Sequence, residues 1–222
     1  MKKPFIVHEM AQGTEEWFSV RAAKLTASRA SDMMAQPRKG STESVTKRNL
    51  RVQLALERIT GRPEIDPYTN ADMRRGTELE PVARALYEAR SGVFVDTVGF
   101  VESTEIPGCG ASLDGYVDDF AGVIEIKCPR PAIHLEYLRG GGLPSDYKEQ
   151  VWHALTVTGA AWCDFISFCP LFPAPLDLWV YRYLATSFDQ VAYKMACRLF
   201  LSEVDREAES IRAMLPQPEV AA

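Results

Sequence analysis

The sequence predicts a mixed α/β fold, with a β-sheet of mixed strand directions and helices on both of its faces. Two observations lead to this class. Segments with the apolar spacing of helices stand on either side of a block of short strands, and turn residues separate those strands. The chain has 222 residues, which suits one domain with a full core. We therefore expect residues 1–222 to form one domain, with a loose tail over residues 216–222.

Five segments are predicted to be helical. Thr14 is a plausible N-cap of the first, which breaks near residues 25–27 and continues with Ser28 as a second candidate cap. In the next segment apolar residues recur at helical spacing, and Gly61 and Pro63 end the pattern. The predicted helices cover residues 14–34, 45–60, 78–90, 146–158 and 187–214.

Five other segments are predicted to be strands, because their apolar and β-branched residues are bounded by turn residues. They cover residues 93–102, 112–118, 122–128, 164–169 and 177–183. Two further segments are predicted to be loops. One is the polar stretch 36–46, and the other surrounds the three glycines at 140–142.

The composition, 46% hydrophobic and 25% charged, is ordinary for a soluble globular protein. No apolar run approaches the roughly 20 residues of a membrane span, and the N-terminus lacks the apolar region of a signal peptide. We therefore expect a cytoplasmic protein without membrane contact. Because the five cysteines are scattered and form no Cys-x-x-Cys pair, we expect buried reduced thiols rather than disulfides or a metal cluster. They are Cys109, Cys128, Cys163, Cys169 and Cys197.

The net charge of −5 argues mildly against indiscriminate coating of DNA. The charge is unevenly distributed, however, since residues 36–62 contain seven Arg or Lys against two acids. This basic segment could be a solvated helix face or a groove wall that contacts phosphates. The second explanation accounts for more of the charge.

Two carboxylates and a lysine are predicted to meet on the hairpin of residues 112–128. Residues two apart on a strand share a face, so Glu125 and Lys127 point the same way, and Asp114 can meet them from the preceding strand. Two carboxylates suit a hard cation such as Mg²⁺, with the carbonyl of Ile126 as a further oxygen ligand. Such a metal activates a water and neutralises a phosphate, which is the chemistry of phosphodiester cleavage. The alternative is an ordinary surface hairpin.

Four separated blocks, in order over most of the chain, resemble the lambda exonuclease family, the phage-type and YqaJ-like recombination exonucleases of the PD-(D/E)XK nuclease superfamily. The blocks are a Trp, Arg and Thr-Ala-Ser pattern in 17–28, Arg-Gly-Thr-Glu-Leu-Glu at 75–80, Ala-Ser-Leu-Asp-Gly to Ile-Glu-Ile-Lys-Cys-Pro at 111–129, and Tyr-Lys-Glu-Gln-Val at 147–151. The resemblance implies a single-domain PD-(D/E)XK nuclease fold, a central mixed sheet flanked by helices. The proline of the superfamily's name is absent, since Leu113 precedes the first carboxylate.

The resemblance also implies roles for the residues of the hairpin. Asp114 and Glu125 match the metal-binding carboxylates, and Lys127 matches the catalytic lysine, which would orient or activate the attacking water. Glu80 matches a helix carboxylate that helps hold the metal or its water. The alternative for Glu80 is an i,i+4 pair with Arg84.

Residues outside the hairpin match further parts of the family pattern. Gln150 matches a glutamine that supports the site from the next helix, and its alternative is a solvated polar position. Arg21, Ser28 and Ser112 match residues that bind the terminal 5′-phosphate, although Ser28 could be a plain helix cap. Met73 falls where the family has an apolar wedge that separates the strands, and its alternative is a buried core methionine.

The function implied by the resemblance is a processive 5′-to-3′ exonuclease on double-stranded DNA, dependent on Mg²⁺, with two metal ions per site and Mn²⁺ as a substitute. It would prefer 5′-phosphorylated ends, release 5′-mononucleotides and leave a 3′ overhang. The implied partners are the other subunits of a homotrimeric ring and a single-strand annealing protein in a bacterial host cell. The alternatives are a related nuclease of other polarity, an endonuclease, or an inactive DNA-binding accessory of the same fold.

Overall fold

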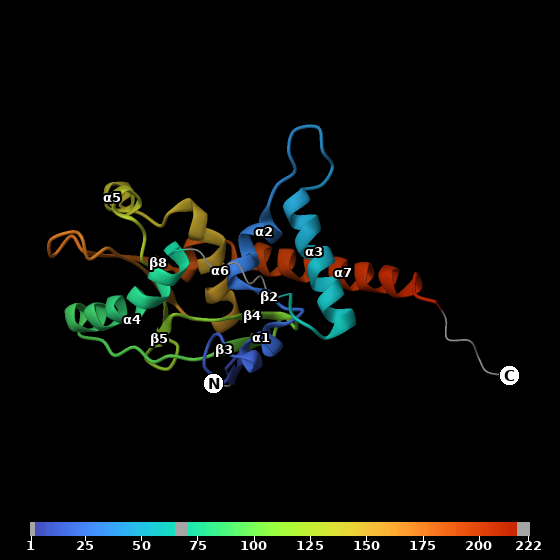
Figure 1. Cartoon of the computed structure of the whole chain (residues 1–222), viewed down its shortest axis with the longest axis horizontal. Coiled ribbons are helices and arrows are strands. Elements are labelled where there is room, and N and C mark those ends of the chain that lie inside the picture. The colour runs from blue at the N-terminus through green and yellow to red at the C-terminus, as the bar shows by residue number, and fades with distance from the viewer. Residues whose placement is uncertain (1–2, 65–70, 217–222) are drawn as a thin grey trace.

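The computed structural model describes residues 3–64 and 71–216 (Figure 1). Its strands form two four-stranded sheets, and each sheet contains both parallel and antiparallel pairs. The first sheet has the order β1 (Phe5–His8), β3 (Phe100–Ser103), β4 (Cys109–Ala111) and β2 (Leu25–Thr26). The second has the order β5 (Gly115–Val117), β6 (Gly122–Lys127), β7 (Trp162–Phe168) and β8 (Leu178–Leu184). The predicted mixed α/β class is confirmed.

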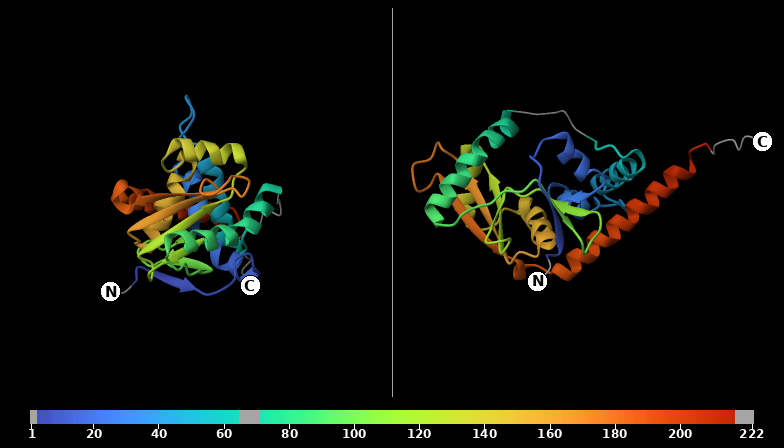
Figure 2. Two further views of the ribbon diagram at one scale, coloured as in Figure 1. Left: turned by 90° about the vertical axis from the view of Figure 1, so that its left-hand side faces the viewer. Right: turned by 90° about the horizontal axis from the view of Figure 1, so that it is seen from below.

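Helices cover both sheets and join them (Figure 2). The α-helices are α1 (Glu15–Arg21), α2 (Ala30–Met34), α3 (Val45–Thr60), α4 (Ala71–Ser91), α5 (Pro131–Gly140), α6 (Lys148–Thr158) and α7 (Gln190–Ala213). Helix α6 contacts strands of both sheets, α4 packs against β6, β7 and β8, and the long α7 packs against α3. Within the two described ranges, no helix combines the length and the apolar character that crossing a membrane requires.

The hairpin that carries the predicted site is formed by β5 and β6. These strands pair antiparallel, with Gly115 opposite Ile124, and β6 pairs parallel with β7. Five of the six residues of β6 are buried, as expected of a strand with a neighbour on each side and a helix on its face. The turn between the strands holds Asp118, Asp119 and Phe120 at positive φ. The Phe120 ring stacks on Tyr116 with a centroid distance of 3.8 Å, which anchors this turn.

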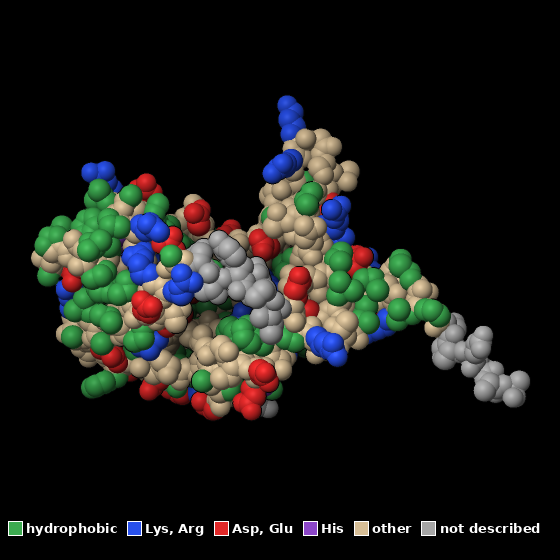
Figure 3. Space-filling view, in the orientation of Figure 1, with side chains coloured by type: hydrophobic (Ala, Val, Ile, Leu, Met, Phe, Trp, Pro, Cys, Tyr) green, Lys and Arg blue, Asp and Glu red, His purple; other side chains and the backbone are tan. Residues whose placement is uncertain are grey.

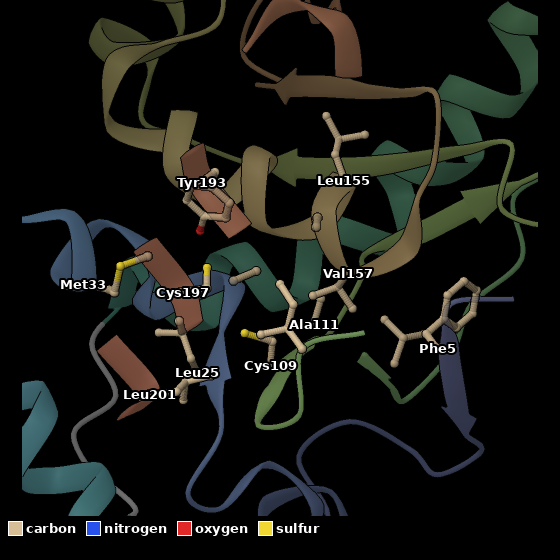
Figure 4. Close-up of a cluster of buried hydrophobic side chains, with 14 of the residues drawn as sticks. Phe5, Leu25, Met33, Cys109, Ala111, Leu155, Val157, Tyr193, Cys197 and Leu201 are labelled. Atoms are coloured by element: carbon tan, nitrogen blue, oxygen red, sulfur yellow. The ribbon is translucent and has the colours of Figure 1, made fainter. Parts of the chain in front are cut away.

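Two clusters of buried side chains form the core. The larger one joins the first sheet to α2, α3, α6 and α7, and Figure 4 shows part of it, with Leu25, Leu155 and Cys197. The smaller one lies between α4 and the second sheet and includes Ala83 and Tyr87. All five cysteines are free thiols, and four of them are buried.

The predicted helices agree with the structure best where a pattern is long. Helix α3 spans the predicted residues 45–60, and Gly61 ends it at a φ of 66°. Helix α4 begins at Ala71 rather than at residue 78, and the first predicted helix is divided into α1, a 3₁₀ turn and α2. The sequence does not predict α5. Its C-cap is Gly141 at a φ of 62°, so glycines that indicated a loop instead end a helix.

The short strands of the first sheet are the other difference. The sequence does not predict β1, β2 or β4, which have between two and four residues each. Of the strand predicted over residues 93–102, β3 covers Phe100–Ser103, and Asp96 makes an isolated bridge to Tyr116. Strands this short contain too few residues for an alternating pattern to be recognised.

Candidate active site

The structure brings the two hairpin carboxylates to one place through a backbone hydrogen bond. Asp114 immediately precedes β5, and its Oδ2 accepts the Ile126 N–H of β6 at 2.6 Å. On β6, Glu125 and Lys127 share a face, and Nζ of Lys127 lies 2.5 Å from Oε1 of Glu125. The predicted meeting of Asp114, Glu125 and Lys127 is therefore what the structure shows.

Gln150 approaches this group from α6. Its Nε2 donates to Oε1 of Glu125 at 2.6 Å, the same oxygen that Lys127 contacts. The solvated alternative for Gln150 is therefore wrong. The Tyr147 ring, just before α6, lies 5.1 Å from Nζ of Lys127 and covers the ammonium group. The carboxylate of Glu125 is thus fixed by two donors from different elements.

Helix α4 supplies the third carboxylate. Oε1 of Glu80 accepts from Nη2 of Arg84 at 2.6 Å, so the i,i+4 pair is present. The same guanidinium also donates through Nε to the backbone carbonyl of Asp114 at 3.0 Å. Arg84 therefore ties Glu80 to the hairpin, and the ion pair and a role in the site are compatible.

Beside these groups lies a cleft of about 410 Å³, called here the acidic cleft. Its wall includes Glu80, Asp114, Ile126 and Lys127, and Met73 of α4 also lines it. Met73 is 53% exposed, so the alternative of a buried core methionine is wrong. Glu80 also borders a second cavity of about 720 Å³, which is lined by residues 9–13 and 97–99.

Burial and like charge raise the proton affinity of the carboxylates. Burial, helped by the Asp114 charge, raises the pKa of Glu80 to about 7. Burial also raises the pKa of Glu125 to about 7, against the opposing effect of Lys127, and burial raises the pKa of Asp114. Burial lowers the pKa of Lys127, but Glu125 and Asp114 raise it more, and the net direction is upward. The crowded negative charge favours a bound cation.

The donor set fits a hard divalent cation. The Asp114 charge raises the pKa of both Glu80 and Glu125, and the Glu80 charge also raises that of Glu125, which requires the three carboxylates to be close. The Ile126 carbonyl belongs to β6, the strand that carries Glu125. Within residues 3–64 and 71–216, no three Asp, Glu, His or Cys side chains converge into a ready-made metal site. Each carboxylate is instead turned toward Arg84, Lys127 or a backbone N–H. A metal would therefore replace these contacts.

Two of the three predicted phosphate-binding residues also meet. Nη1 of Arg21 donates to Oγ of Ser112 at 2.5 Å, and the Trp17 indole N–H donates to the same oxygen at 3.0 Å. The Arg21 guanidinium lies 4.0 Å from the Trp17 ring centroid. Burial, helped by the nearby charge of Arg29, lowers the pKa of Arg21 to about 10.

The third residue, Ser28, contacts Thr26. Its side chain is exposed, and its Oγ lies 3.3 Å from Oγ1 of Thr26. The prediction that Ser28 caps a helix is wrong, because it lies inside the 3₁₀ turn Ala27–Arg29, whose N-cap is Thr26. Sequence reasoning missed the neighbours of Arg21 on the other side, Arg29 and Glu57, since no local pattern connects them.

The predicted basic segment is partly neutralised within the chain. On α3, Lys47, Arg51 and Arg58 pair with carboxylates of α7, and Arg51 also pairs with Glu43. These three residues therefore attach α3 to α7. Lys and Arg side chains also stand at the tip of the projecting segment between α2 and α3 (Figure 3). The charge available to a phosphate backbone is thus smaller than the sequence indicates.

Comparison with known proteins shows which family the chain resembles. The model of the YqaJ-like viral recombinase domain matches residues 16–161. The crystal structure of an alkaline exonuclease from Laribacter hongkongensis is 36% identical, with a TM-score of 0.78, and the alignment covers 90% of this chain and 97% of that one. The same exonuclease in complex with dAMP is 37% identical, with the same TM-score and coverage.

A phage-related exonuclease from Haemophilus somnus 129PT shares the fold, with a TM-score of 0.61 at 12% identity over 86% of this chain and 95% of that one. No curated protein matches the chain in sequence. The family model spans the blocks that carry Arg21, Glu80, Asp114, Glu125 and Gln150. The chain therefore belongs to the family of YqaJ-like viral recombinase domains, as its resemblance to the phage-type recombination exonucleases implies.

Proposed function

We propose that the protein is a Mg²⁺-dependent exonuclease that degrades one strand of double-stranded DNA from its 5′ end. The observation that carries the proposal is the convergence of Asp114, Glu125 and Lys127 beside Glu80 in the acidic cleft. The similarity to an alkaline exonuclease over nearly the whole chain supports it. The products would be 5′-mononucleotides and a duplex with a 3′ single-stranded overhang.

The metal would be held by Asp114, Glu125 and the carbonyl of Ile126, with Glu80 as a direct ligand or through a water. When bound, Mg²⁺ would activate a water and neutralise charge on the phosphate. We propose two ions per site, with Mn²⁺ able to replace them. The oxygen-only donor set and the raised pKa of Glu125, to about 7, support a hard cation here.

Lys127 would orient the attacking water and stabilise the negative charge that develops on the phosphate oxygens. The water oxygen bonds to phosphorus, and the bond from phosphorus to the 3′ oxygen of the terminal nucleotide breaks. Gln150 would hold Glu125 in place through its 2.6 Å hydrogen bond while Lys127 moves toward the substrate. The second nucleotide then carries the new 5′-phosphate and can enter the same site.

Polarity would come from the phosphate-binding residues. Arg21 and Ser112 would bind the terminal 5′-phosphate, and Ser28 would add a hydroxyl from the 3₁₀ turn. The hydrogen bond between Arg21 and Ser112 supports a shared ligand for this pair. Met73, exposed on the wall of the acidic cleft, would be the wedge that separates the strands.

We further propose that residues 1–222 act as one nuclease domain and that three copies form a ring around DNA, which would make digestion processive. Its partner would be a single-strand annealing protein that coats the overhang, so that the pair serves DNA recombination in the cytoplasm of a bacterial host. Light scattering tests the ring, since a monomeric mass in the presence of duplex DNA would contradict it.

The function is tested with linear duplexes that carry a 5′-phosphate or a 5′-hydroxyl, with and without Mg²⁺, beside a closed circular duplex. We expect release of mononucleotides from the 5′ end, faster with a 5′-phosphate, with no activity in EDTA and no cutting of the circle. Asp114→Asn should lose most of its activity on every substrate. Cleavage of the circle would identify an endonuclease, and release from the 3′ end would reverse the polarity. A purified protein that binds ends without digesting them would be an accessory.

A further inference from the structure

A small cavity of about 90 Å³ adjoins Arg21, and it is called here the arginine cavity. The residues that line it include Arg21 and Arg29, Thr26 of β2, and Glu57 of α3. Ser112 is bonded to Arg21 but does not line this cavity. Arg21 therefore stands between the hydroxyl of Ser112 and a space that a second arginine shares.

Arg29 has hydrogen-bonding capacity that the described residues do not use. Its Nη2 lies 3.5 Å from Oε1 of Glu57, whereas its Nη1 is buried and has no hydrogen-bond partner in the part of the chain that the structure describes. A buried donor without a partner is costly, and such a group in a native protein calls for a ligand or an ordered water. Arg29 thus brings to the lining of the arginine cavity a side chain whose hydrogen-bonding capacity is not fully used.

Glu57, the partner of Arg29, is buried and accepts several hydrogen bonds. It is 3% exposed, and it accepts the backbone N–H of Ala23 at 2.6 Å, that of Glu64 at 3.1 Å and the Gln53 amide at 3.1 Å. With these donors and Arg29 around it, the carboxylate is a fixed anchor. Its charge offsets part of the charge of Arg29 and Arg21.

The two guanidinium groups repel each other. Arg29 contributes, after burial, to the lowering of the Arg21 pKa to about 10. Two cations at one small cavity are held together at a cost, and an anion that contacts both would remove that cost. A phosphate group presents acceptor oxygens that match the planar donor fork of arginine.

We propose that Arg29 is a second, specificity-determining arginine, and that Arg29 and Arg21 together recognise the terminal phosphate of the DNA strand. A terminal phosphate monoester carries about −1.5 to −2 charges at pH 7, whereas an internal phosphodiester carries one and a 5′-hydroxyl carries none. Two guanidinium groups favour the monoester over both. The proposal rests on the proposed function, since it assigns the preference for a 5′-phosphorylated end to this pair.

The first test measures phosphate binding without DNA or metal. The melting temperature is recorded in EDTA with increasing inorganic phosphate, against sodium chloride of equal ionic strength. The wild type should be stabilised by phosphate, and Arg29→Gln should lose that stabilisation. Arg29→Lys keeps the charge without the fork and should retain a small part of it. Arg206→Gln removes the same charge from an exposed position on α7 and should behave like the wild type.

The second test measures the preference itself. Binding of 5′-phosphorylated and 5′-hydroxyl duplexes is compared in EDTA, and their degradation is compared in Mg²⁺. Arg29→Gln should lower the ratio of the rate on phosphorylated ends to the rate on hydroxyl ends by about tenfold, the loss expected for a hydrogen bond to a charged group. Rescue of part of the ratio by Arg29→Lys separates recognition from a folding defect.

The outcomes distinguish this inference from the proposed function. If Arg29→Gln keeps the phosphate stabilisation and the end preference of the wild type, the inference is overturned while exonuclease activity can stand. It is also overturned if phosphate stabilises the wild type no more than chloride does. If the wild type binds phosphorylated ends through Arg29 but digests no duplex, the arginine cavity is confirmed and the proposed function fails.

Discussion

The acidic cleft and the arginine cavity both gather like charges, but they hold those charges differently. In the acidic cleft every carboxylate accepts from a donor of the chain: Glu80 from Arg84, Asp114 from a backbone N–H, and Glu125 from Lys127 and Gln150. Internal donors therefore occupy the carboxylate oxygens that a cation would need. Metal binding would require the carboxylates to give up these hydrogen bonds and ion pairs, because they do not form a preorganised metal site.

In the arginine cavity the compensation is incomplete. One buried carboxylate, Glu57, accepts a hydrogen bond from Nη2 of Arg29, and Nη1 of Arg29 has no protein partner among the described residues. Arg21 is bonded to Ser112 on its other side. Substitutions in the two regions should therefore have different effects. Those in the acidic cleft should abolish hydrolysis, and those in the arginine cavity should abolish recognition of the DNA end.

The largest effect is expected from Asp114→Asn. The change removes a proposed metal ligand and the acceptor charge beside Ile126, so kcat should fall on the order of 10³-fold, the equivalent of several kcal/mol of transition-state stabilisation. The KM for 5′-phosphorylated ends should change little. Single-turnover digestion checks this, with Asp118→Asn in the exposed turn as the control. A large rise in KM instead would show that the two regions are not separable.

The converse test is Arg21→Gln. Because this residue would contact the phosphate with its own charge, kcat/KM on 5′-phosphorylated ends should fall by about 100-fold, the upper range for hydrogen bonds to a charged group. Degradation of 5′-hydroxyl ends should be nearly unaffected. Steady-state kinetics on the two duplexes measures the difference, and an equal loss on both substrates would contradict a role in end recognition.

A smaller effect is expected from Gln150→Ala. Its hydrogen bond to Glu125 makes Gln150 a positioning residue, and loss of such a contact should lower kcat or metal affinity by about tenfold. Titration of activity with Mg²⁺ should show a shift to higher metal concentration. A variant with lower activity at an unchanged Mg²⁺ requirement would place the role of Gln150 elsewhere.

The smallest expected effect is a pH dependence of the stabilisation by metal. The folded-state pKa values of Glu80 and Glu125 are raised to about 7 from 4.5, so their contribution to stability is present below pH 4.5 and is lost as the pH rises through about 7. Mg²⁺ needs the ionised carboxylates, and so the rise in melting temperature on its addition should be larger at pH 8 than at pH 5.5. Glu125→Gln should flatten this dependence, and an equal rise in both buffers would contradict it.

How far the sequence predicts this molecule depends on the length of each pattern. The alternation of β6 and the turn before it place Glu125 and Lys127 on one face, and the 16 residues of α3 suffice for helical spacing. Strands such as β4, with three residues, carry no recognisable period. Helix α5 is hidden because Gly141, its C-cap, resembles a loop signal in the sequence.

Some contacts of the candidate site can likewise be predicted from the sequence, and others cannot. The contact of Gln150 with Glu125 is anticipated by the resemblance to a family and by no local pattern, since 25 residues separate the two. Arg29 and Glu57 are 28 residues apart, and each stands in a segment whose spacing indicates an ordinary helix. Pairing of this kind is decided by how α3 packs against α2, which only the folded chain reveals.

Arg84 couples the position of Glu80 to that of Asp114. One guanidinium joins Glu80 of α4 to the backbone of Asp114, and α4 in turn is seated on the second sheet through Ala83 and the Tyr87 hydroxyl, which donates to Asp164 at 2.7 Å. The positions of two proposed ligands, Glu80 and Asp114, therefore both depend on how α4 packs on the second sheet. Any displacement of that helix on its sheet moves both ligands at once. The geometry of the candidate active site therefore depends on core contacts that do not touch the substrate.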